Sequence, residues 1–136
     1  MIILLRHARA GRRGSVEPDA ERPLDDRGRR QAAELAQRLQ SFDVQRVLSS
    51  PAVRCVQTVE PLAAELGVAV ERCDRLAEGT PVDQMRALIE ELAGVAAVLC
   101  THGDLTTALL GGHYLRKGHA VVLDPARGLE PVEFLA

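Results

Sequence analysis

The chain begins with an apolar block that runs directly into positive charge, in the sequence MIILLRHARAGRRG. Residues 2–6 predict a short strand that is apolar on both faces, which is typical of a parallel sheet covered by helices on both sides. The strand ends on Arg6 and His7, and three further arginines follow by position 13. A buried strand that delivers a histidine into a group of arginines indicates a site for an anion at the end of that strand.

The length and composition are those of one globular domain. The chain has 136 residues, of which 46% are hydrophobic and 26% are charged, so we expect a single domain over residues 1–136. Aromatic residues make up only 2% of the chain, which argues against the stacking surfaces that bind single-stranded nucleic acid. The net charge of −2 gives no overall attraction for polyanions, so we expect no nucleic-acid partner and only a local positive field.

Neither a targeting signal nor a membrane span is predicted. The opening apolar block is too short for a signal peptide, and its cations follow it instead of preceding it. No apolar run reaches the length that a bilayer requires. The three cysteines, Cys55, Cys73 and Cys100, lack CxxC spacing, so we expect reduced thiols in a cytoplasmic protein with no membrane partner.

Hydrophobic periodicity predicts strands that alternate with helices along the chain. We expect strands at 2–6, 46–50, 68–73, 95–102, 119–124 and 130–135, and helices at 26–40, 51–66, 82–93 and 105–110. A long polar loop at 8–24 follows the first strand. This order predicts an α/β fold in which a mostly parallel sheet is covered by helices on both faces.

Polar residues next to the helices suggest how each helix begins. We expect Asp25 or Asp26, Ser50 and Asp104 to cap three of them, with Pro51 at the first position of the second helix. Pro61 lies inside that helix and should kink or break it. We expect Arg22 to form an ion pair with Asp25 or Asp26.

The residues that can carry chemistry fall where the predicted strands end. These residues are Arg6, His7, Arg54, Glu78, His102 and Gly103. Ligands bind outside the carboxyl ends of parallel strands, so we expect these residues to meet at one edge of the sheet. Two guanidinium groups, a second imidazole and a helix amino terminus suit a tetrahedral dianion, and the central histidine can attack phosphorus in line. The arginines supply the positive charge, so this arrangement requires no metal and no cofactor.

Four segments of the chain resemble the motifs of a known family. LLRHARAG, RPLDDRGRRQA, RVLSSPAVRCVQT and LCTHGD are similar, in this order, to the blocks of the histidine phosphatase, or phosphoglycerate-mutase-like, superfamily. RHA in place of RHG, the RPL block and the short chain resemble the SixA-type phosphohistidine phosphatases. RCVQT, PLAAELG, RKG and VVLD also resemble the histidine phosphatase domain fused to MutT-type Nudix hydrolases, which acts on nucleotides.

The resemblance implies a three-layer α/β/α fold and a role for each residue of the candidate site. His7 matches the nucleophile that is phosphorylated, and Arg6, Arg54 and His102 match the phosphate pocket, which Gly103 adjoins. Glu78 falls where many members place the proton donor. Arg13 stands where many members carry a phosphate-binding asparagine, so it is a further candidate phosphate ligand.

The sequence therefore predicts a metal-independent phosphatase that works through phospho-His7. The first hypothesis for its substrate is a phosphohistidine-bearing protein, as in the SixA type. The alternatives are a nucleotide phosphohydrolase and a catalytically silent module that binds phosphate.

Overall fold

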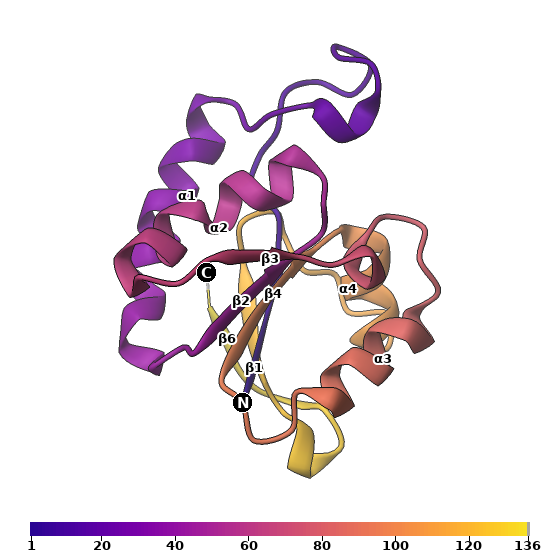
Figure 1. The fold of residues 1–136 in the computed structure, drawn as a ribbon. Helices are drawn as coiled ribbons and strands as arrows, with labels where there is room; N and C mark the ends of the chain where they lie inside the picture. Colours follow the sequence, from indigo (N-terminus) through magenta and orange to yellow (C-terminus); the bar gives the residue numbers. More distant parts are fainter. Residues whose placement is uncertain (136) are drawn as a thin grey trace.

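The computed structural model describes residues 1–135 as a six-stranded sheet between two layers of helices (Figure 1). The strands are β1 (Ile2–Arg6), β2 (Arg46–Ser49), β3 (Val70–Arg72), β4 (Ala97–Thr101), β5 (Ala120–Asp124) and β6 (Glu130–Leu135). The helices are α1 (Asp26–Leu39), α2 (Val53–Leu66), α3 (Val82–Glu91) and α4 (Gly103–Leu109), with short 3₁₀ turns between some elements. Within the described residues, no helix is both long and apolar enough to cross a membrane.

The sheet has the strand order β3-β2-β4-β1-β5-β6. β3, β2, β4 and β1 are parallel neighbours, whereas β5 is antiparallel both to β1 and to β6. Among the described strands, β5 alone therefore runs against the others. The prediction of an α/β fold with a mostly parallel sheet is confirmed.

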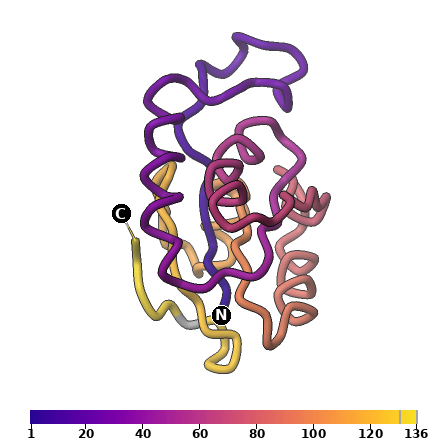
Figure 2. The backbone as a smooth tube through the Cα atoms, turned by 60° about the vertical axis from the view of Figure 1, so that its left-hand side comes forward, coloured from indigo at the N-terminus to yellow at the C-terminus, as the bar shows by residue number. Residues whose placement is uncertain are grey.

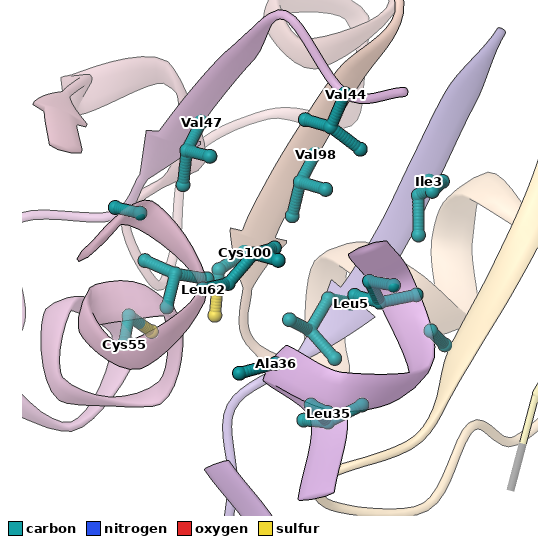
Figure 3. Packing of buried hydrophobic residues seen from close by; sticks show 14 of the residues in the cluster. Ile3, Leu5, Leu35, Ala36, Val44, Val47, Cys55, Leu62, Val98 and Cys100 are labelled. Atoms are coloured by element: carbon teal, nitrogen blue, oxygen red, sulfur yellow. The ribbon is translucent and has the colours of Figure 1, made fainter. Parts of the chain in front are cut away.

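Apolar side chains alternate along the strands and divide the core between the two faces of the sheet. Ile3 and Leu5 of β1 belong to the cluster that contains the buried residues of α1 and α2. Ile2 and Leu4 belong to the opposite cluster, which contains those of α3 and α4. Figure 3 shows the first cluster, with α1 and α2 side chains directed at the strands. Because the central strands are buried on both faces, their positions are fixed, and so are the loops that follow them.

The start of α2 differs from the prediction. The helix begins at Val53, so Pro51 precedes it and Ser50 is not its cap. The Ser50 hydroxyl group contacts His102 instead. The helix also continues through Pro61 without a break, because α2 buries apolar residues against the core on both sides of the proline.

The start of α4 also differs from the prediction. The helix begins at Gly103, two residues earlier than expected, and His102 occupies the cap position. Asp104 lies within the first turn, where its Oδ2 accepts a hydrogen bond from the Gly79 backbone N–H at 2.9 Å. Asp104 therefore holds the loop after β3 and does not cap α4. The predicted cap of α1 is confirmed, since Asp25 accepts a hydrogen bond from the Gly28 N–H.

The residues after β1 extend beyond the sheet at the end opposite the amino terminus. Figure 2 shows this 8–24 segment in indigo and purple, folded back toward the start of α1. A short antiparallel bridge between Ala10 and Leu24 closes the segment, and a 3₁₀ turn at Asp19–Glu21 lies within it. The segment therefore stands above the carboxyl ends of β1 and β4.

Gly28 in the first turn of α1 tests how tightly this segment is held. A Cβ atom at Gly28 would lie 1.9 Å from the carbonyl oxygen of Arg9, and backbone atoms cannot move aside easily. We expect Gly28→Ala to lower the free energy of unfolding by about 2 kcal/mol, because overpacking outweighs the helix preference for alanine. Chemical denaturation measures this change. Gly11→Ala is the control, since its Cβ would have no neighbour closer than 3.7 Å, and an equal effect of both variants would contradict the account.

Candidate active site

The two histidines predicted for the site lie together at the edge formed by the ends of β1 and β4. His7 directly follows β1 and His102 directly follows β4. Their ring centroids are 5.5 Å apart and the ring planes meet at 65°. Because β1 and β4 are parallel neighbours, residues 95 positions apart in the chain share one site. The predicted convergence of these residues is confirmed.

The His7 ring is buried and held in one tautomer. Its Nδ1 lies 2.8 Å from the carbonyl oxygen of Ala8. A carbonyl oxygen only accepts, so Nδ1 carries the hydrogen and Nε2 keeps its lone pair. The backbone N–H of His7 also donates to the Thr101 carbonyl at 3.0 Å, which ties the start of the loop to β4.

The surroundings of His7 keep its ring neutral. Burial lowers its pKa from 6.5 to about 3; the hydrogen bond to Ala8 opposes this shift, and electrostatic interactions with His102, Arg54 and Arg6 add to it. At neutral pH the ring is therefore an uncharged base with a free lone pair on Nε2. Such a ring can act as a nucleophile.

Arg54 and Ser50 orient His102. The Arg54 side chain is almost completely buried, and its Nη2 lies 3.3 Å from Nδ1 of His102. A guanidinium group only donates, so Nδ1 of His102 accepts, and the hydrogen on Nε2 is donated to the Ser50 Oγ at 2.8 Å. Ser50 is thus a site residue that sequence reasoning placed at a helix cap, because the start of α2 could not be fixed from the sequence.

Arg6 and Arg54 each have a buried donor without a hydrogen-bond partner. Arg6 donates from Nη1 to the Leu115 carbonyl at 3.0 Å, and its guanidinium group lies against Gly103. The Nε atoms of both arginines are buried and have no hydrogen-bond partner among residues 1–135. A buried N–H without an acceptor is costly, so two of them beside His7 indicate that the site is built for an anionic ligand.

Asp19 connects the loop to the buried arginine, a role that the sequence analysis missed. Its Oδ2 lies 3.3 Å from Nη2 of Arg54, and its backbone carbonyl accepts from Arg54 Nη1 at 3.1 Å. Its Oδ1 pairs with Arg22 at 3.0 Å, and this hydrogen bond is the main cause of the lowered pKa of Asp19. The predicted pairing of Arg22 with Asp25 or Asp26 is therefore wrong, since Asp25 pairs with Arg9. The spacing of three residues between Asp19 and Arg22 was the available signal.

Glu78 and Arg13 lie at the outer side of the same site. One carboxylate oxygen of Glu78 is 3.7 Å from Nη2 of Arg54, and the other is 3.4 Å from Nη2 of Arg13. Arg13 also contacts Asp19 at 3.4 Å and is largely exposed. Both side chains therefore line the entrance to the site, with Arg13 already engaged by two carboxylates.

A surface cavity of about 480 Å³ opens onto His7. Seven cationic side chains line it: Arg6, Arg9, Arg12, Arg13, Arg22, Arg27 and Lys117. Only two carboxylates, those of Glu78 and Asp104, lie among its lining residues. Across residues 1–135, no group of three or more His, Cys, Asp or Glu side chains is arranged to hold a metal ion. The positive charge of the site therefore comes from its own side chains, in a chain whose net charge is −2.

The pKa of His7 predicts how stability depends on pH. The unfolded chain takes up a proton on His7 near pH 6.5, whereas the folded chain does so only near pH 3. The free energy of unfolding should therefore fall as the pH drops through this window, by on the order of 1–3 kcal/mol at pH 4, and His7 should have no such effect above it. Denaturant unfolding of the wild type and of His7→Asn at pH 7.5 and pH 4 measures this. Equal losses in both proteins would contradict a neutral, buried His7.

Gly103 controls the position of the Arg6 guanidinium group. A Cβ atom at Gly103 would lie 2.7 Å from Cζ of Arg6, so the side chain would have to move. We expect Gly103→Ala to lower kcat/KM for the phosphatase activity predicted from the sequence by about 100-fold, because a displacement of about 1 Å is costly in a preorganised site. Steady-state kinetics measures this, with Ala108→Ser on the exposed face of α4 as control. Full activity of Gly103→Ala would show that the position of Arg6 is unimportant.

Comparison with sequence families identifies relatives of the chain. The model of the histidine phosphatase superfamily (branch 1) matches residues 2–91. Over 115 residues the chain is 35% identical to the 8-oxo-(d)GTP phosphatase of Mycolicibacterium smegmatis, which covers 80% of this chain and 36% of that protein. The chain therefore spans about a third of the length of this relative.

Solved structures show the same fold over nearly the whole chain. The protein histidine phosphatase SixA complexed with tungstate has a TM-score of 0.81 and 26% identity, covering 99% of this chain and 96% of that one. SixA from Agrobacterium tumefaciens has a TM-score of 0.83 and 24% identity, with coverage of 99% and 97%. The predicted phosphoglycerate-mutase-like fold is thus confirmed. The family match shows that the chain belongs to the histidine phosphatase superfamily.

Proposed function

We propose that this protein is a phosphatase that hydrolyses its substrate in two steps, through a phosphoryl group held covalently on His7 and without a metal ion. The observation that best supports the proposal is the state of the His7 ring. The ring is neutral, and its Nδ1–H donates a hydrogen bond to the Ala8 carbonyl. Its Nε2 lone pair is therefore available, next to two buried arginines whose Nε–H groups have no partner among residues 1–135.

In the first step, Nε2 of His7 forms a bond to phosphorus while the bond between phosphorus and the leaving group breaks. Negative charge stays on the three equatorial oxygens, and the Nε–H groups of Arg6 and Arg54 are suited to donate to them. His102, held by Ser50, lies beside the His7 ring and positions Arg54 in this phosphate pocket. Gly103 belongs to the pocket because a larger residue would displace Arg6.

Glu78 is the proposed proton donor. Its carboxyl group lines the cavity within 3.7 Å of Arg54 and is exposed enough to meet a leaving group. In the first step it gives its proton to the leaving oxygen or nitrogen, and in the second it accepts a proton from the water that attacks phosphorus. The bond between Nε2 and phosphorus then breaks, which releases phosphate and restores neutral His7. Arg13, which contacts Glu78, holds this carboxylate at the entrance and is a further candidate phosphate ligand.

We infer that the substrate is a nucleotide carrying more than one phosphate. The 35% identical relative is an 8-oxo-(d)GTP phosphatase, although this chain matches only 36% of that protein. The strong excess of cations around the cavity supports the same inference, since it suits a leaving group that is itself anionic.

A phosphohistidine-bearing protein is the second candidate substrate. Similarity to the protein histidine phosphatase SixA over 99% of this chain and 96% of that one supports it. The open cavity beside exposed side chains could receive a phosphorylated side chain of another protein. The imidazole of a phosphohistidine is also a better leaving group than an alkoxide, so its hydrolysis depends less on the proton donor.

Trapping of the intermediate tests the proposed mechanism. The wild-type enzyme, mixed with a nucleoside triphosphate in EDTA and quenched within milliseconds, should carry one phosphoryl group on His7, located by mass spectrometry. His7→Ala should carry none and should lose at least about 10³-fold in kcat, because the covalent step is removed. Loss of activity in EDTA that magnesium restores would contradict the proposal, as would unchanged turnover by His7→Ala.

Steady-state kinetics separates the two substrate candidates. The enzyme is offered a nucleoside triphosphate and a histidine-phosphorylated protein at matched concentrations. A higher kcat/KM for the triphosphate supports the nucleotide, and a higher value for the phosphoprotein supports the SixA-like activity. A chain that binds either substrate but turns over neither would be a phosphate-binding module.

A further inference from the structure

The cavity in front of His7 is larger than one phosphoryl group requires, and it is lined by more cations than one phosphoryl group needs. Glu78 and Asp104 provide the only carboxylates among its lining residues. The lining also includes Arg12, Arg27 and Lys117, which come from three separate segments. A single transferred phosphoryl group, bound by Arg6 and Arg54 next to His7, accounts for none of these three cations.

Arg12, Arg27 and Lys117 also differ in their partners from Arg9, Arg13 and Arg22, which line the same cavity. Arg9 pairs with Asp25, Arg22 with Asp19, and Arg13 with two carboxylates. Within residues 1–135, the salt bridges include neither Arg12 nor Arg27 nor Lys117. Three like charges that share one cavity repel one another unless an anion lies between them.

The three segments are held in place around the cavity by Gln31 of α1. Its side-chain oxygen accepts from the Arg9 backbone N–H at 2.9 Å, and its side-chain nitrogen donates to the Lys117 carbonyl at 3.5 Å. Next to Lys117, Gly118 has a φ of +76° and donates from its backbone N–H to the His7 carbonyl at 3.0 Å. The loops that carry Arg12 and Lys117 are thereby tied to the helix that carries Arg27 and to the end of β1.

Building on the function proposed above, we propose that Arg12, Arg27 and Lys117 form a second anion subsite, which binds the phosphates that are not transferred. The terminal phosphoryl group of a nucleoside triphosphate goes to Nε2 of His7, and the bond from its phosphorus to the bridging oxygen breaks. The nucleoside diphosphate that leaves carries its negative charge toward these three cations. The subsite therefore selects polyphosphate esters over monophosphates and over neutral leaving groups.

Substrates of graded charge test the subsite. The triple variant Arg12→Gln/Arg27→Gln/Lys117→Gln is compared with the wild type on p-nitrophenyl phosphate and on a nucleoside mono-, di- and triphosphate of one base. The readout is kcat/KM for the triphosphate divided by that for p-nitrophenyl phosphate. An exposed ion pair contributes roughly two- to fivefold, so we expect this ratio to fall on the order of 10- to 100-fold in the variant, through a higher KM for the triphosphate.

Arg86→Gln/Arg38→Gln/Arg127→Gln is the matched control, because it removes the same charge from exposed arginines that do not line the cavity. It should leave the ratio within about twofold of the wild-type value, since solvent and salt screen exposed charges that lie outside the cavity. An equal fall in the control and in the variant would overturn the subsite, because the effect would then be one of net charge.

Failure of the subsite can be distinguished from failure of the mechanism. If His7 is phosphorylated but the ratio is unchanged in the variant, the subsite is wrong and the two-step mechanism stands. The subsite is also wrong if the wild type prefers the nucleoside monophosphate, or prefers a histidine-phosphorylated protein to the triphosphate. If the wild type hydrolyses no substrate and His7 carries no phosphoryl group, both proposals fail.

Discussion

The structure depends on keeping one imidazole neutral among cations. Positive groups beside His7 disfavour its protonated form, and burial disfavours that form even more. The hydrogen bond from Nδ1 to the Ala8 carbonyl then decides which nitrogen holds the lone pair. The same cations that disfavour a charge on His7 attract the anion that His7 would attack. The arginines therefore both keep the nucleophile neutral and form the binding site.

This arrangement requires a rigid sheet behind it. His7 and His102 follow neighbouring parallel strands, whose side chains are packed on both faces against two pairs of helices. Arg54 is buried in the first turn of α2, so its charge loses solvation by water. An ion pair with Asp19 of the 8–24 loop and a hydrogen bond to His102 offset this loss. The 8–24 segment therefore has a structural part in the site, since it supplies the acceptors that make a buried guanidinium group tolerable.

Much of this could be predicted from the sequence, because periodicity and strand ends are local signals. The six strands and four helices, the Asp25 cap and the meeting of His7, Arg54 and His102 all follow from patterns within short segments. The partners of polar side chains could not be predicted in the same way. Ser50 and Asp104 suit helix caps, but each helix starts at a position set by packing, which frees both side chains for contacts with distant residues. Asp19 was missed because its contact with Arg54 depends on the path of a long loop.

A crystal structure of the protein with orthovanadate would test the central claim most directly. Vanadate adopts the five-coordinate geometry of phosphorus under in-line attack. The account predicts vanadium bonded to Nε2 of His7, with equatorial oxygens within 3.2 Å of the Nε atoms of both Arg6 and Arg54, a normal N–H···O distance. Vanadate bound elsewhere in the cavity, with His7 Nε2 out of reach and either arginine Nε still unpartnered, would contradict it.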